Sequence, residues 1–259
     1  MSDGGWRLAA FEALCLTDPS GKCAAVAGLT ATCGPEVPTV AAAALDWARV
    51  PGRPDQPQLV HPRSVPTRGL GSPSGRAALA HAVAHIEFNA INLALDAACR
   101  FDGMPAAFYR DWLSVAGDEA RHFQMLSRRL SELGYAYGDF PAHNGLWEAA
   151  EKTAHDVMVR MALVPRVLEA RGLDVTPGMI RRLQEVGDDA TVDVLRVILD
   201  EEVRHVAIGS RWFRYLCGLR GLEPVGTFRA LLHDYGMQLR PPFNREARMA
   251  AGFLDSELG

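Results

Sequence analysis

The sequence predicts an all-α protein built around an antiparallel four-helix bundle. Apolar side chains recur at helical spacing over four stretches of about 25 residues, and Gly- or Pro-containing turns separate these stretches. The alternating pattern of β-strands is nearly absent. The chain has 259 residues, of which 48% are hydrophobic and 22% are charged. This composition is typical of a globular protein with a sizeable core.

Residues 1–73 are expected to form a helical segment and a Pro-rich connector that pack on the bundle. Residues 5–48 alternate Ala-rich stretches with turn sequences such as Asp18-Pro19-Ser20-Gly21 and Gly34-Pro35. This pattern predicts two or three short helices. Residues 51–73 contain six prolines and no apolar periodicity, which predicts an extended connector.

The bundle is expected over residues 74–218. Ser72-Pro73 predicts the start of its first helix, because proline is favoured at the first helical position. Asp102-Gly103 ends that helix, and Pro105 opens the second, which runs to Gly134.

The second half of the bundle follows a loop at residues 135–145. A third helix is predicted over 146–171, ended by Gly172, and Thr176-Pro177 predicts the start of a short helix. Asp188 or Asp189 is expected to cap a fourth long helix that runs to about Cys217.

Residues 219–259 are expected to form a C-terminal helical extension. Pro224 opens one helix there, and Pro241-Pro242 separates it from a last one.

The pattern acid-Glu-x-Arg-His occurs twice on predicted long helices. Residues 118–122 read Asp-Glu-Ala-Arg-His, and residues 201–205 read Glu-Glu-Val-Arg-His. Residues three apart on a helix share one face, so the Glu and the His can bind the same metal ion. A dinuclear carboxylate site in a bundle takes one Glu-x-x-His from each of two helices and one Glu from each of the other two.

Two further glutamates complete such a set. Glu87 precedes Glu119 by 32 residues, and Glu169 precedes Glu202 by 33. Glu87 and Glu169 both interrupt apolar helical runs, where an unpaired carboxylate would cost several kcal/mol. The sequence therefore predicts a dinuclear metal site with six ligands: Glu87, Glu119, His122, Glu169, Glu202 and His205.

A simpler alternative applies to each of these residues singly. One Glu-x-x-His is more often a surface pair than a ligand set, and a buried Glu can bond a neighbouring arginine such as Arg121, Arg166 or Arg204. Six residues in the expected order at nearly equal spacing favour the metal site.

The six ligand positions on four predicted helices resemble those of the ferritin-like di-iron carboxylate proteins. More narrowly, the run HIEFNAINLA at residues 85–94, the paired acid-Glu-x-Arg-His motifs and the Pro-rich lead-in resemble the ferritin-like domain-of-unknown-function family 455. The resemblance covers about residues 5–235. It implies a ferritin-like bundle and a di-iron centre on the six residues above, but it supplies no substrate.

The residues beside the ligands fit a supporting role. Metal-bound histidine usually donates its second ring N–H to a carboxylate. By resemblance to oxygen-activating relatives, Asp118 is expected to reach His205, and Glu201 is expected to reach His122. Arg121 and Arg204 would then neutralise these two acids.

Carboxylate and imidazole ligands without thiolate suit iron or manganese. The resemblance favours two Fe ions and an O₂-activating oxidase or hydroxylase that acts on a small organic substrate, with an electron donor if it is a hydroxylase. No catalytic residue beyond the metal centre and no organic cofactor site are predicted. The alternatives are a ferroxidase or iron store, a peroxide reductase of the rubrerythrin kind, a tRNA-modifying hydroxylase and a metal-stabilised scaffold.

Composition argues against several other classes. The 31 acidic residues outnumber the 27 basic ones, which disfavours a nucleic-acid partner. The five cysteines contain no Cys-x-x-Cys pair, which disfavours a disulfide framework or a rubredoxin-type iron site. No apolar stretch is long enough to span a membrane and no secretory signal is evident, so a cytoplasmic location is expected. The oligomeric state is not specified.

The sequence also supports predictions for three further residues. Pro165 lies inside the third predicted helix, four residues before Glu169, and is expected to kink or bulge the helix there. His81 and His85 are expected to have polar roles in the core or at the surface rather than to bind the metal.

Overall fold

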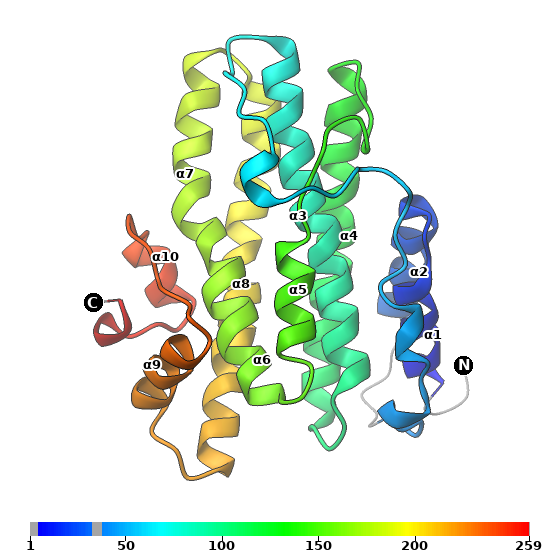
Figure 1. Ribbon diagram of the computed structural model, residues 1–259, viewed down its shortest axis with the longest axis vertical. Coiled ribbons are helices and arrows are strands. Elements are labelled where there is room, and N and C mark those ends of the chain that lie inside the picture. The colour runs from blue at the N-terminus through cyan, green and yellow to red at the C-terminus, as the bar shows by residue number, and fades with distance from the viewer. Residues whose placement is uncertain (1–4, 33–37, 259) are drawn as a thin grey trace. The chain divides into compact units, whose positions relative to one another are not determined.

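Helices make up the regular secondary structure of the residues that the computed structural model describes, 5–32 and 38–258 (Figure 1). Within these residues, the β pairing is one isolated bridge between Leu59 and Ala142. The expected turn at Gly34-Pro35 lies outside the described residues. None of the helices described is long and apolar enough to cross a membrane. The chain divides into two compact units, Met1–Trp147 and Glu148–Gly259.

The first unit is organised around one pair of long helices, α3 and α4, which run side by side (Figure 1). Helix α1 packs against α3, and helix α2 packs against α4. The helices of this part of the chain are α1 (Trp6–Cys15), α2 (Pro19–Thr32), α3 (Pro73–Arg100), α4 (Ala106–Glu132) and α5 (Gly145–Lys152), the last of which crosses the unit boundary.

The ends of α3 and α4 confirm the predictions from local sequence. The Ser72 side chain accepts a hydrogen bond from the backbone N–H of Gly75 at 3.1 Å, and Pro73 takes the first helical position. Gly134, just past the end of α4, has a φ of +82°, a conformation that only glycine adopts without strain.

The predicted connector, which begins at residue 51, is extended up to the start of α3, apart from the 3₁₀ turn η3 (Pro62–Ser64). Two other 3₁₀ turns, η1 (Ala42–Ala44) and η2 (Trp47–Arg49), precede it. Its Gly52 donates to the carbonyl of Leu14 at 2.9 Å, so closely that a Cβ on Gly52 would lie 2.1 Å from the carbonyl oxygen of Cys15. The buried Lys22 ammonium donates to the carbonyls of Leu14 and Gly52, each at 3.0 Å, and to Asn92. Lys22 therefore ties α2, the connector and α3 together.

The second unit is organised around α8, against which α6, η4 and α7 pack. The smaller helices α9 and α10 also contact α8. The elements are α6 (Val157–Leu163), the π-helix η4 (Val164–Glu169), α7 (Ala170–Glu185), α8 (Asp189–Leu219), α9 (Pro224–Asp234), α10 (Arg245–Ala250) and the 3₁₀ turn η5 (Asp255–Glu257). Asp188 caps α8 by accepting from Thr191 N–H at 3.1 Å, and Pro224 opens α9, as predicted.

The prediction for the third helix, 146–171, was wrong in its extent. The helix breaks after Lys152 and restarts at Val157, because the Asp156 side chain accepts the N–H groups of Met158 and Val159 as an N-terminal cap. It then continues without a stop through η4 and α7 to Glu185.

Two residues that suggested a helix boundary therefore lie inside α7. Gly172 keeps a negative φ, and a Cβ there would lie 4.0 Å from Cγ of Glu202, so this glycine faces α8 rather than ending the helix. Pro177 has no N–H to offer to the carbonyl of Leu173, four residues earlier. The side chain of Asn244 donates to that carbonyl at 3.2 Å instead. A distant amide thus replaces the bond that Pro177 removes.

Candidate metal site

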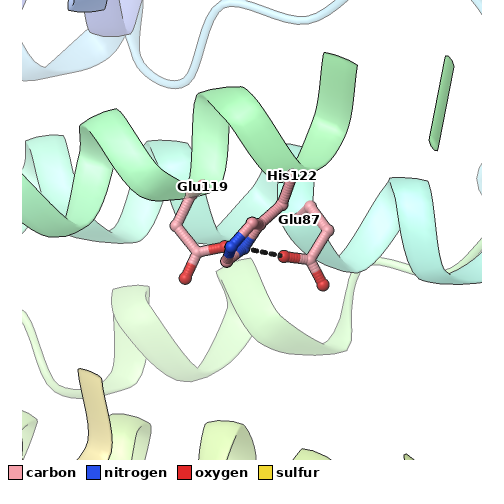
Figure 2. A group of neighbouring side chains, drawn as sticks. All are labelled: Glu87, Glu119 and His122. Atoms are coloured by element: carbon pink, nitrogen blue, oxygen red, sulfur yellow. Dashed lines mark hydrogen bonds and ion pairs between the residues drawn. The ribbon is translucent and has the colours of Figure 1, made fainter. Parts of the chain in front are cut away.

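Helices α3 and α4 bring together three of the six predicted ligands (Figure 2). Nδ1 of His122 lies 3.1 Å from Oε2 of Glu87 and 3.4 Å from Oε2 of Glu119. One ligand atom of each residue lies within 4.8 Å of the others. Glu119 and His122 come from one face of α4, as their spacing requires, and Glu87 comes from the neighbouring α3.

These three side chains are removed from water, with exposed fractions of 5% for Glu87, 2% for Glu119 and 0% for His122. Burial raises the pKa of Glu87 well above its ordinary value, and the charge of Glu119 raises it further. Burial by itself would lower the pKa of His122, but the hydrogen bonds and charges of Glu119 and Glu87 outweigh it and raise this pKa to about 10. The cluster therefore attracts positive charge, which either protons or a metal ion can supply.

The donor atoms are of the kind that bind metal ions. Two carboxylates and one imidazole could together hold one ion. Two carboxylates also carry the charge that balances one divalent cation, so an ion here would not leave a net charge in the core.

The second unit holds the other three predicted ligands. On α8, Oε2 of Glu202 lies 3.2 Å from Nδ1 of His205, and both residues are buried. Glu169 is the last residue of the π-helix η4, which packs against α8, and it is half-buried. The bulge expected at Pro165 is confirmed as this π-helix, a distortion frequent at functional sites.

The contact between Pro165 and α8 explains the position of the π-helix. A Cβ on Gly209 would lie 2.4 Å from Cγ of Pro165. The proline ring therefore occupies the space that any side chain at position 209 would need. Gly209 allows η4 to approach α8 closely beside Glu169.

Ion pairs are seen for two of the arginines near the predicted ligands. Arg121 pairs with Asp118 on the same helix at 3.0 Å. Arg166 is fully buried and pairs with Glu257 at 2.6 Å. On α8, Glu201 is half-buried and Arg204 is exposed. The expected pairings of Asp118 with His205 and of Glu201 with His122 stay predictions.

His81 and His85 have the polar roles expected of them. Nε2 of His81 accepts from the backbone N–H of Gly138 at 2.9 Å. Nδ1 of His85 lies 2.8 Å from the hydroxyl of Tyr137, and its Nε2 lies 3.1 Å from the carbonyl of His143. Burial lowers the pKa of His85 to about 4, so this ring is neutral near pH 7.

Sequence reasoning missed Tyr137. Its ring packs against Phe88, with centroids 5.6 Å apart, and against Phe123, with centroids 5.0 Å apart, beside the Glu87 and His122 positions. Tyr137 belongs to the loop after α4, where no periodic pattern marks a buried residue.

Comparison with known proteins finds a matching protein family. The family described as "Protein of unknown function (DUF455)" matches residues 15–259. A protein of Haemophilus influenzae described as "Uncharacterized protein" is 49% identical over 213 residues, which are 79% of this chain and 74% of that protein. No solved structure matches the chain significantly.

Proposed function

The chain belongs to the DUF455 family, and from its residues we propose that it is a non-haem di-iron protein, an O₂-dependent oxidase or hydroxylase of a small organic substrate. The observation that carries this proposal is the buried group formed by Glu87, Glu119 and His122. Acidic side chains are costly to bury without compensating positive charge, and this group has the composition of an iron ligand set.

The first ion would be held by carboxylate oxygens of Glu87 and Glu119 and by a ring nitrogen of His122. The second would be held by Glu169, Glu202 and His205. Under this proposal, the two sets form one dinuclear centre in a ferritin-like four-helix bundle. Its support is the repeated order of a helix bearing Glu followed by a helix bearing Glu-x-x-His, with spacings of 32 and 33 residues.

Iron with such ligands supplies redox chemistry with O₂. The chain's own residues prepare the site for it. Burial of Glu87 and Glu119 excludes water, which strengthens electrostatic interactions there. The raised pKa of His122 keeps a proton on its ring in the metal-free protein, and this proton leaves when a cation takes its place.

Iron analysis and O₂ consumption test the proposal. Protein loaded with Fe(II) should hold about two iron ions per chain, one for each Glu-x-x-His. With a reductant in air, it should consume more O₂ than its bound iron alone can reduce. Accumulation of tens of iron ions per chain as mineral would support iron storage instead. Bound Fe(II) that reacts with neither O₂ nor peroxide would overturn the enzyme assignment.

A further inference from the structure

A small cavity lies between the connector and α3 in the first unit, apart from the candidate metal ligands. Its volume is about 130 Å³. We call it the connector pocket, and its walls include Leu59 and Phe88 as apolar surfaces and Arg53, His85, Asn89 and Tyr137 as polar groups. An engineered cavity of about 150 Å³ holds one benzene molecule. The connector pocket therefore admits a ligand of about six non-hydrogen atoms.

Asn89 presents an unused acceptor to the pocket. Its side chain is 3% exposed, and its Nδ2 donates to the backbone carbonyl of His85 at 2.8 Å. This bond identifies which end of the amide carries the nitrogen. Oδ1 of Asn89 then has no hydrogen-bond partner among the described residues. A buried carbonyl oxygen of this kind gains free energy from a donor on a ligand.

Tyr137 presents a second acceptor. The Tyr137 hydroxyl lies 2.8 Å from Nδ1 of His85. Nε2 of the same ring lies 3.1 Å from the carbonyl of His143 and 3.1 Å from Nδ2 of Asn89, so its two neighbours favour opposite tautomers of His85. In either tautomer the phenol oxygen keeps at least one lone pair that can accept a hydrogen bond from a ligand.

Positive charge beside the pocket indicates which kind of charged group a ligand would carry. The Arg53 guanidinium lines the space, and its charge acts on both Tyr137 and His85. The exposed Asp55 also lines the pocket, but water screens its charge more than that of the half-buried Arg53. The charge of Arg53 therefore favours an anionic group over an ammonium group.

We propose that the connector pocket binds a small hydroxy-carboxylate, whose carboxylate pairs with Arg53 and whose hydroxyl donates its single proton to Asn89 Oδ1 or to the Tyr137 oxygen. The planar guanidinium of Arg53 would pair with the carboxylate of the ligand, and the acceptor oxygens would receive the proton of its hydroxyl. None of the residues that line the pocket is a proposed metal ligand, and the proposal does not depend on the metal centre.

Calorimetric titration of the full chain with L-lactate tests the proposal, with metal-free and iron-loaded protein compared. L-Lactate should bind both forms equally well and saturably. Propionate lacks the hydroxyl and propane-1,2-diol lacks the carboxylate, and each should bind at least about tenfold more weakly. Arg53→Met should weaken lactate binding about tenfold or more, and Tyr137→Phe should reduce the preference for lactate over propionate.

Two further variants test whether lactate binds in the pocket itself. Leu59→Trp should abolish binding by filling the pocket without removing a polar group. Arg63→Met removes one exposed positive charge from the same connector and should leave binding unchanged. Absence of lactate binding, or binding that Arg53→Met and Leu59→Trp leave unchanged, would overturn the proposal. Binding to the iron-loaded form alone would indicate chelation at the metal centre, which overturns the pocket and leaves the di-iron proposal standing.

Discussion

Nδ1 of His122 lies 3.1 Å from the carboxylate of Glu87, although the two residues are 35 positions apart and both are buried. The neighbouring Glu119 adds a second carboxylate to the same space. Such a group is stable only with positive charge among its members, because two buried like charges repel each other strongly. A metal ion and protons compete for this role.

Replacing a carboxylate of the metal site should lower the iron content of the protein, whereas replacing an exposed carboxylate should not. Glu119→Gln keeps the side-chain shape but removes a charge from the buried group, so most of the iron should be lost. Glu132→Gln, on the same helix in an exposed pair with Arg129, is the matched control and should keep it. Metal analysis of the two variants decides between these outcomes, and equal iron contents would exclude Glu119 as a ligand.

The contact between Pro165 and Gly209 should be sensitive to one methyl group. Gly209→Ala would place a Cβ 2.4 Å from the proline ring, so it should destabilise the protein by about 1–3 kcal/mol. Adding Pro165→Ala should restore much of that loss, because the clashing ring is gone. Gly218→Ala on α8 has open space around its new Cβ and should be neutral or stabilising by up to about 1 kcal/mol. Urea unfolding measures all four proteins, and equal effects at positions 209 and 218 would contradict the packing explanation.

The buried pair between Arg166 and Glu257 should contribute far more than an exposed pair in the same segment. Arg166 is fully buried, and its guanidinium lies 4.8, 4.1 and 4.7 Å from the ring centroids of Phe213, Phe228 and Phe253. Glu257→Gln leaves this buried cation without its counter-charge, which should cost about 3 kcal/mol or more.

The control for Glu257 is Asp255, two residues earlier in η5. Asp255 pairs with Arg245 at 2.6 Å, and both side chains are exposed. Asp255→Asn should change the free energy of unfolding by less than about 1 kcal/mol. Thermal or urea unfolding that gives similar losses for the two variants would show that Arg166 does not need the Glu257 charge.

Acid should destabilise the protein through His81. Burial lowers the pKa of His81 to about 4, against a smaller opposing effect of Asp139. The unfolded chain therefore binds a proton on this ring at a higher pH than the folded protein does, and stability falls as the pH drops from about 6.5 towards 4. The loss from this residue should reach up to about 3 kcal/mol.

His81→Gln isolates this contribution, because Oε1 of glutamine can accept the Gly138 N–H as Nε2 of His81 does. The variant should show a shallower fall in stability between pH 6.5 and 4, measured by urea unfolding at each pH. His61→Gln in the exposed connector is the matched control. A slope as steep in His81→Gln as in the native chain would assign the acid sensitivity to other groups.

Local sequence determined much of this protein. The starts of α3, α8 and α9 follow from Ser72-Pro73, Asp188 and Pro224, because caps and prolines act on backbone groups within one helical turn. The π-helix at Pro165 was foreseeable for the same reason, since the missing N–H disturbs its own helix. The spacing of Glu119 and His122 likewise places both on one face of α4.

Tertiary structure decided what depends on distant partners. Gly172 and Pro177 suggested a helix boundary, yet α7 continues because Asn244 satisfies the carbonyl that Pro177 leaves without a donor. Tyr137 and Arg166 acquired their roles from His85 and Glu257, which lie 52 and 91 residues away in the chain. A hydrogen bond depends on distance in space, and only packing brings groups so far apart in sequence within reach of each other.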